Sequence, residues 1–403
     1  MPRSDRIART VHALSLVALL AWIGIDLLGK PVFGDRPWPD GVIDFRLIYD
    51  YSRQVLETHR YPPIYPHPPS AVLLQALATQ TEFAIAAAIW ITLTAGMTVA
   101  LYATLLAMLR REQRPSAWWI ALAAHGIATY FLQWEFRSLN CNLMFLGALV
   151  FAASAVQRNR PHLAGFWLAV GISLKLYPIL VVPYLFWTRR RSAGFSAVAW
   201  LGVFWMVLPA AVFGRDLGLV YSDWFAQITR AADPLNHSPH PILISINTAA
   251  DWLAQGDARW ATAIVWSVRT LWLAAIAGVM IAARRSRDCH DVRVLLSDIA
   301  LLTLAPIAVS PYLEPYHAVP FVIPAIVLVS TAADASVDRR QRAISGVVAL
   351  LSAAMVPALV PWSGRGLLVC GKLFVGAVGA AAVSRANRAS QRRSPAIFTR
   401  RAA

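Results

Sequence analysis

The stretch "HLAGFWLAVGISLKLYPILVVPYLFW" at residues 162–187 decides how this chain can fold. It is mostly apolar, is interrupted by the segment "KLYP" at 175–178, and is flanked by Arg160 and Arg189. Arginine marks the cytoplasmic side of membrane proteins, so both ends of the stretch point to one side. The stretch is too short for two spans of about 20 residues each, and proline ends or kinks a helix. We therefore expect two half-length helices that enter the membrane and return. The alternative is a single span, with one flank on the other side.

The apolar composition extends this expectation to the whole chain. Of its 403 residues, 58% are hydrophobic and 14% are charged, whereas soluble domains carry about 25% charged residues. The apolar residues form blocks of roughly 17–25, the length that crosses a bilayer. We expect an all-α polytopic membrane protein with about ten transmembrane helices besides the broken pair. Their expected positions are near residues 10–30, 82–109, 117–134, 140–156, 193–213, 260–283, 294–311, 316–333, 343–361 and 366–384.

The net charge of +16 is carried by short arginine clusters between the apolar blocks. This is the positive-inside pattern of a membrane protein, and it argues against a nucleic-acid partner. The clusters place both chain ends on the cytoplasmic side. We expect one membrane domain over residues 1–384 and a basic, disordered tail over 385–403. The first apolar run, 11–28, lacks a convincing cleavage site for a signal peptide, so we expect it to remain as a helix.

Four polar stretches fall on the opposite, outer side with this threading: a loop at 44–70, a short turn at 135–142, a longer loop at 214–247 and a turn at 310–317. The first lies in an outer loop, 31–81, that we expect to be catalytic. The chain has no P-loop, no GxGxxG and no HExxH, and its three cysteines lack metal-ligand spacing. We therefore expect no cofactor and no metal; the alternative is a metal ion shared by Asp44 and Asp50. The polar residues suit a lipid-linked phosphate substrate better than a soluble nucleotide.

Asp44 is the first candidate for catalysis. A carboxylate beside a membrane can act as a general base if it reaches a substrate hydroxyl. In a helix over residues 44–59, Asp44, Ile48, Tyr51 and Val55 would share one face. The alternative is that Asp44 only caps that helix, because aspartate is favoured at helix N-termini.

Lys175 and Arg269 are cations inside apolar blocks. Charged residues are costly within a membrane and usually have a function there. The phosphate of a substrate would suit either cation, and so would a carboxylate on a neighbouring helix.

His67 and Asn142 lie in two of the outer stretches. Prolines on both sides of His67 hold the backbone extended, so the loop can present its rings against a groove or can be a plain rigid connector. Asn140 and Asn142 can bind sugar hydroxyls or a phosphate, or can simply satisfy backbone groups at the turn.

Glu314 and His317 stand at the mouth of two expected helices. Histidine titrates near neutral pH and can shuttle a proton or orient a phosphate. His237 and His240 are rivals for the same roles. Any one of these histidines can instead be a satisfied residue between helices.

These elements follow one another in a definite order: Asp44, "YPPIYPHPP" at 61–69, "LNCN" at 139–142, "AG…LK.YP" at 164–178 and "SP…H" at 310–317. The order resembles the integral-membrane glycosyltransferases of the C fold. More closely it resembles family 87, which includes the polyprenol-phosphate-mannose-dependent mannosyltransferases of actinobacteria. The Gly-Gln-x-Asn element of that family keeps only its last residue here, Asn142.

The resemblance implies an inverting hexosyltransferase with the C-type fold. It would take a sugar, most simply mannose, from a polyprenyl-phosphate donor and pass it to a lipid or cell-envelope glycan on the outer face of a bacterial inner membrane. Asp44 would activate the acceptor hydroxyl, and His317 would assist the base or steady the phosphate. The substrate-binding residues would be His67, Asn142, Lys175, Tyr177, Arg269 and Glu314.

Two other classes of protein are compatible with the same pattern. A transporter or flippase of a lipid-linked sugar would also need intramembrane charges and broken helices, although the chain shows no repeated halves. A non-catalytic membrane partner could keep the fold without using Asp44.

Overall fold

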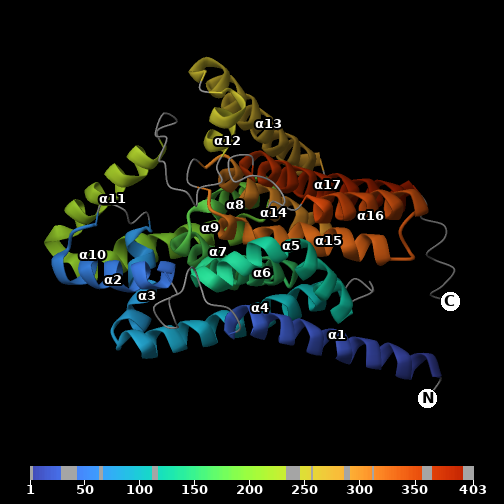
Figure 1. The fold of residues 1–403 in the computed structure, drawn as a ribbon, viewed down its shortest axis with the longest axis horizontal. Coiled ribbons are helices and arrows are strands. Elements are labelled where there is room, and N and C mark those ends of the chain that lie inside the picture. Colours follow the sequence, from blue (N-terminus) through green and yellow to red (C-terminus); the bar gives the residue numbers. More distant parts are fainter. Residues whose placement is uncertain are drawn as a thin grey trace.

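The computed structural model describes residues 3–28, 43–62, 67–110, 117–232, 246–255, 257–285, 291–310, 313–355 and 365–393. Every regular element within these ranges is helical, as the sequence predicts (Figure 1). In chain order they are α1 (Arg3–Leu28), α2 (Ile43–Thr58), α3 (Pro69–Thr79), α4 (Phe83–Arg110), α5 (Trp118–Ser138), α6 (Asn142–Gln157), α7 (Pro161–Leu174), η1 (Tyr177–Leu180), α8 (Val181–Trp187), α9 (Arg191–Gly202), η2 (Val203–Val207), α10 (Leu208–Phe213), η3 (Gly214–Asp216), α11 (Leu217–Ala232), α12 (Ile246–Leu253), α13 (Ala258–Arg285), α14 (Val292–Ala308), η4 (Pro315–Phe321), α15 (Val322–Ala333), α16 (Arg339–Ala354) and α17 (Arg365–Arg393).

The chain is a multi-pass membrane protein. A helix is present at each of the ten expected positions. Among the described residues, six segments are long and apolar enough to cross a membrane, so the expected number of about ten spans is not confirmed. The six are Ile7–Leu27, Phe83–Arg110, Arg191–Thr229, Ala258–Arg284, Pro315–Ala333 and Leu368–Ala386.

The apolar stretch 162–187 is broken where the sequence predicts. Helix α7 ends before Lys175, whose backbone is extended, and the chain then turns through η1 into α8. Ser196, near the start of α9, donates from Oγ to the His162 carbonyl at 3.2 Å. Because α9 follows α8 directly, the two ends of the stretch lie at the same side of the bundle. This arrangement agrees with a pair of helices that enters and returns, with Lys175 between them.

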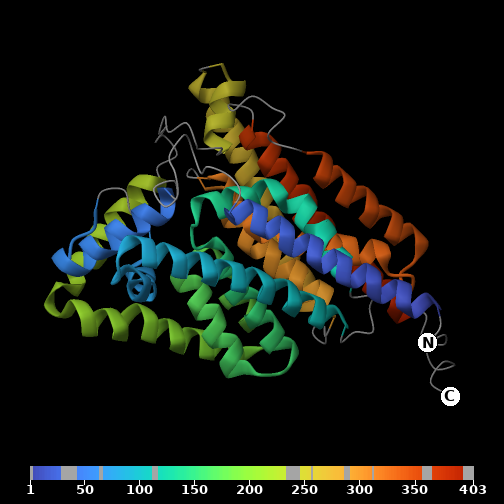
Figure 2. The ribbon, with the colours of Figure 1, turned by 60° about the horizontal axis from the view of Figure 1, so that its bottom comes forward.

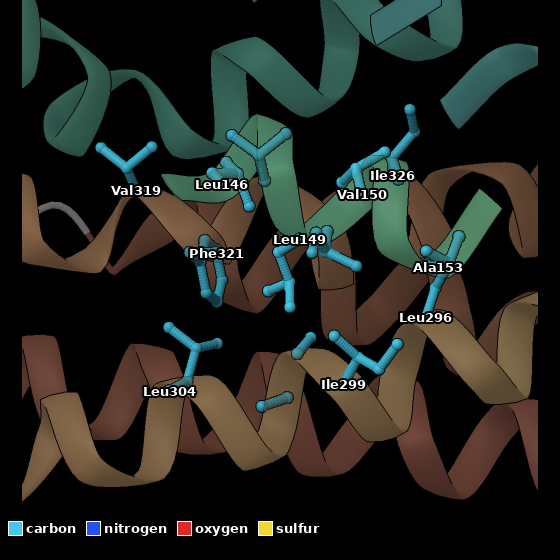
Figure 3. Close-up of a cluster of buried hydrophobic side chains, with 14 of the residues drawn as sticks. Leu146, Leu149, Val150, Ala153, Leu296, Ile299, Leu304, Val319, Phe321 and Ile326 are labelled. Carbon is cyan, nitrogen blue, oxygen red and sulfur yellow. The ribbon is translucent and has the colours of Figure 1, made fainter. Parts of the chain in front are cut away.

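The core of the bundle is built around α14 and α15, which are buried along nearly their whole lengths. Figure 3 shows Leu149 of α6 facing Ile299 of α14, and Phe321 of η4 lies in the same apolar layer. Close burial of large apolar side chains supplies the main stabilisation of such a cluster. The core therefore holds η4 against neighbouring parts of α5 and α6.

The amphipathic helix α2 packs at one end of the bundle with α3 and α11 (Figures 1 and 2). Ile48 and Val55 are buried and Tyr51 is half-buried, and Phe45 and Tyr49 are buried as well. A hydrogen bond between His59 Nδ1 and Asp216 Oδ2, at 2.7 Å, ties the residue after α2 to η3, which directly precedes α11.

The prediction of a long loop over 214–247 is wrong for its first part. Residues of this segment form α11, and the buried Val220 and Trp224 lie one helical turn apart on its inner face. Gln227 of the same face donates to the Pro62 carbonyl. His237 and His240 lie outside the described residues.

Helix α17 continues past residue 384 to Arg393, so residues 385–393 are helical and the predicted tail begins too early. Arg385 Nη2 donates to Asp298 Oδ1 of α14 at 2.5 Å. Asp298 also accepts from the Tyr184 hydroxyl of α8 at 3.0 Å. A buried carboxylate thus anchors this part of α17. Residues 394–403 lie outside the described residues.

Candidate active site

Asp44 lies in the first turn of α2, and its side chain is half-buried. Its Oδ2 accepts a hydrogen bond from Nδ2 of Asn140 at 3.2 Å. The two residues are far apart in sequence, so this bond joins α2 to the turn between α5 and α6. The Asp44 carboxylate therefore contacts a residue outside its own helix.

Asp50, the second aspartate of α2, has different surroundings. It is exposed, and its Oδ2 pairs with Nε of Arg46 at 3.0 Å on the same helix. Exposed ion pairs of this kind contribute about 0–1 kcal/mol. Asp50 therefore offers a matched aspartate outside the candidate site.

The α5–α6 turn presents Asn140 in a fixed orientation. Leu139 has a left-handed backbone, with φ 48°, and its carbonyl accepts from Trp90 Nε1 at 2.9 Å. The amide N–H of Cys141 donates to Asn140 Oδ1 at 2.7 Å. Because that oxygen is occupied by a donor, the amide nitrogen is the end that faces Asp44.

Glu135 is a residue of this region that the sequence reasoning missed. It is fully buried, and its two carboxylate oxygens accept from Asn142 Nδ2 at 2.7 Å and from the Leu143 N–H at 3.1 Å. Asn142 is fully buried as well, so in this structure it secures the turn. An acidic residue immediately before a tight turn between two apolar helices was the available signal.

Lys175 reaches the same region from the break after α7. Its side chain is only 9% exposed, and its charge acts on His67, Glu135 and Glu314. Within the described part of the chain, the Lys175 ammonium makes no hydrogen bond or ion pair. A buried ammonium without such a partner is suited to an anionic ligand.

Glu314 and His317 form a reciprocal cap at the start of η4. The Glu314 side chain accepts from the His317 N–H, and the Glu314 N–H donates to His317 Nδ1 at 3.3 Å. A neutral His317 ring with Nδ1 as acceptor carries its proton on Nε2. The ring packs edge-on against Tyr177, with centroids 5.7 Å apart.

The electrostatics join these groups into one cluster. Burial and the nearby Asp44 carboxylate raise the pKa of Glu314 above its ordinary value, although the Lys175 ammonium opposes this shift. Burial lowers the pKa of His67 well below its ordinary value, and the Lys175 ammonium adds to this shift. His67 is therefore neutral at neutral pH, and Glu314 resists ionisation.

Arg269 is not joined to this cluster by any contact among the described residues. It lies on α13, where its guanidinium packs over Trp266 of the same helix at 5.3 Å from the ring centroid. Its predicted part in substrate binding stays a prediction. In the ranges that the structure describes, no three acidic, histidine or cysteine side chains are grouped so that they could hold a metal ion.

Comparison with protein families decides the class of this chain. The family model of glycosyltransferase family 87 matches residues 65–311. The chain belongs to glycosyltransferase family 87. The matched residues of this family 87 protein include His67, Glu135 and Lys175, whereas Asp44 and His317 lie outside the matched range.

Two solved structures are similar to this family 87 protein, and both are of ArnT from Cupriavidus metallidurans. The apo structure shares 14% sequence identity, with a TM-score of 0.39 over 92% of this chain and 76% of that chain. The structure bound to undecaprenyl phosphate shares 13% identity, with a TM-score of 0.37 over 94% of this chain and 78% of that chain. None of the curated proteins matches the chain.

The cluster of this family 87 glycosyltransferase combines groups with complementary chemistry. Asp44 can accept a proton, Lys175 can neutralise an anion, and the Nε2–H of His317 can donate a hydrogen bond. The broken stretch 162–187 delivers the cation, while α2 and η4 deliver the carboxylate and the imidazole. Such a set can perform acid–base chemistry on a hydroxyl beside a phosphate.

Proposed function

We propose that this family 87 protein transfers a hexose from a polyprenyl-phosphate donor to a hydroxyl of a lipid or cell-envelope glycan. The observation that carries the proposal is the grouping of the Asp44 carboxylate and the Lys175 ammonium around Glu314, at one end of an apolar bundle. The reaction needs a base for the acceptor hydroxyl and a positive charge for the leaving phosphate. Both groups are present in the cluster.

The proposed transfer is a single displacement. The acceptor oxygen attacks the anomeric carbon from the face opposite the phosphate, and Asp44 takes the hydroxyl proton. As the new glycosidic bond forms, the bond between the anomeric carbon and the phosphate oxygen breaks. Polyprenyl phosphate leaves with the bonding electron pair, and the anomeric configuration is inverted. Lys175 stabilises the charge that develops on the phosphate.

His317 is assigned to the phosphate rather than to the base. Its Nδ1 accepts from the Glu314 backbone, so the neutral ring offers a donor at Nε2. A donor suits a phosphate oxygen, whereas a general base must offer a free lone pair. Tyr177, Glu314 and the neutral His67 are the remaining substrate-binding residues of the proposal.

Mannose as the sugar and the C-type fold are proposed from the motif order. The first turn of α1 and the last turn of α17 lie at the same end of the bundle (Figures 1 and 2), which supports an arrangement with both chain ends on one side. The arginine clusters assign that side to the cytoplasm. We therefore propose that transfer takes place on the outer face of a bacterial inner membrane.

The direct test is sugar transfer by the purified protein in detergent. The protein receives radiolabelled polyprenyl-phosphate mannose and, in parallel, the glucose and galactose counterparts, together with a lipid extract of the host. We expect a labelled glycolipid or glycan without any membrane gradient. Movement of intact donor across vesicles without a new glycosidic bond would support the flippase alternative instead.

A further inference from the structure

We propose that Glu135 is a positioning residue of the transfer site, which holds the α5–α6 turn so that Asn140 is presented to Asp44. The inference rests on the proposed role of Asp44 as the base. The inference adds to the site a buried residue that supports the reacting groups without being one of them.

Glu135 holds the start of α6 through both oxygens of its carboxylate. Asn142 donates to Oε2 through its side chain at 2.7 Å, and Leu143 donates to Oε1 through its backbone N–H at 3.1 Å. A negative charge at a helix N-terminus is also favoured by the helix dipole. Glu135 is fully buried, so water cannot replace these bonds if its carboxylate is removed.

Asn140, within this turn, makes the contact with Asp44. Asn140 lies between Glu135 and Asn142 in sequence, and its side chain is oriented by the Cys141 N–H at 2.7 Å. The remaining end of the Asn140 amide donates to Asp44 at 3.2 Å. A chain of hydrogen bonds and short backbone therefore runs from Glu135 to the proposed base.

Glu135 also acts on the cluster through its charge. Its carboxylate repels that of Asp44 and attracts the Lys175 ammonium. Burial raises the pKa of Glu135 to about 7, so this repulsion is weak at the acidic pH where an aspartate titrates. Loss of the Asn140 hydrogen bond is then the larger effect of Glu135→Gln, and it disfavours the ionised form of Asp44. This consequence separates a positioning role from a purely structural one, because a structural anchor would change stability without changing the ionisation of the base.

The test compares wild type with Glu135→Gln, which keeps the shape and removes the charge. Glu82→Gln, at an exposed carboxylate before α4, is the matched control. Hydrogen–deuterium exchange on the full chain in detergent follows the α5–α6 turn and the first turn of α2. Sugar transfer is then measured against pH, because the acid limb of kcat/KM reports the ionisation of the base in the free enzyme.

We expect Glu135→Gln to raise exchange in the turn and in the first turn of α2, and to move the acid limb to higher pH. The control should match wild type in both measurements. Unchanged exchange at α2, or an unmoved acid limb with lower stability, would overturn the proposal. The exchange experiment does not depend on activity. It therefore decides the coupling even if wild type transfers no sugar, a result that counts against the proposed function alone.

Discussion

Asn140 donates from Nδ2 to Asp44 Oδ2 across 3.2 Å, and this bond connects the α5–α6 turn to α2. A hydrogen bond to a carboxylate stabilises its ionised form, which is the form that a general base needs. The bond also fixes where the carboxylate points. Through this bond, Asn140 influences both the ionisation and the orientation of the proposed base.

Replacement of Asn140 tests this relationship through charge. Asn140→Asp places a second carboxylate against Asp44, and like charges at this distance disfavour ionisation. We expect the acid limb of kcat/KM to move upward by about one pH unit or more, whereas Asn140→Ala should move it less. Identical pH profiles for all three proteins would show that Asn140 does not act on the base.

Lys175 should matter mainly for the donor. Lys175→Met removes the ammonium at nearly constant volume, and we expect KM for the polyprenyl-phosphate donor to rise about tenfold, which corresponds to about 1.4 kcal/mol. Lys175→Arg keeps the charge and should keep part of the affinity. Steady-state kinetics against donor concentration measure both. A Lys175→Met enzyme with unchanged KM and kcat would remove Lys175 from the proposed phosphate site.

Glu314→Gln should change how stability depends on pH. The pKa of Glu314 is raised from 4.5 by burial and by Asp44, so the folded chain keeps a proton that the unfolded chain releases. Its contribution to stability is complete below pH 4.5 and is lost as pH rises through the raised pKa. Wild type should therefore lose stability relative to Glu314→Gln between about pH 5 and pH 9.

Melting temperatures of the two proteins in detergent, measured across that range, check this expectation. Glu82→Gln, which alters an exposed carboxylate, is the control. The interpretation of Glu314 as a buried, proton-holding carboxyl is wrong if the difference in melting temperature stays constant with pH.

Replacement of Gly165 tests how closely α7, the first helix of the broken stretch, packs against α9. A Cβ at Gly165 would lie 2.5 Å from the Ala197 backbone nitrogen and from the Ser196 side chain. Gly165→Ala should therefore destabilise the contact of α7 with α9 by about 1–3 kcal/mol. Gly96→Ala is the control, because nothing lies within 4 Å of its Cβ. A Gly165→Ala protein as stable in heat as the control would contradict this packing.

Local sequence was sufficient for the features that depend on local physics. Lysine and proline inside an apolar stretch predicted the break at Lys175, and a helix over residues 44–59 was expected where α2 lies. The prediction of a loop at 214–247 was wrong because polar residues in the segment hid the apolar spacing of α11. The inner face of α11 is buried against residues of α2, α3, η2 and α10.

The site itself depends on contacts that no local pattern contains. Asn140 and Asp44 come into contact only because α2 packs at the end of the bundle beside the α5–α6 turn. Glu135 acquires its role only in the folded chain, where it accepts a hydrogen bond from the start of α6. Arg269 looked equivalent to Lys175 as an intramembrane cation. The structure separates them, since Lys175 lies in the cluster and Arg269 packs on its own helix.

The measurement that most directly tests the central claim is the rate of sugar transfer by Asp44→Asn, with Asp50→Asn as the matched control on the same helix. General bases contribute about 10²–10⁴-fold to rate. We predict that Asp44→Asn loses at least about 100-fold in kcat and retains its fold and donor KM, while Asp50→Asn stays close to wild type. Transfer by Asp44→Asn at a rate near that of wild type would contradict the assignment of Asp44 as the base.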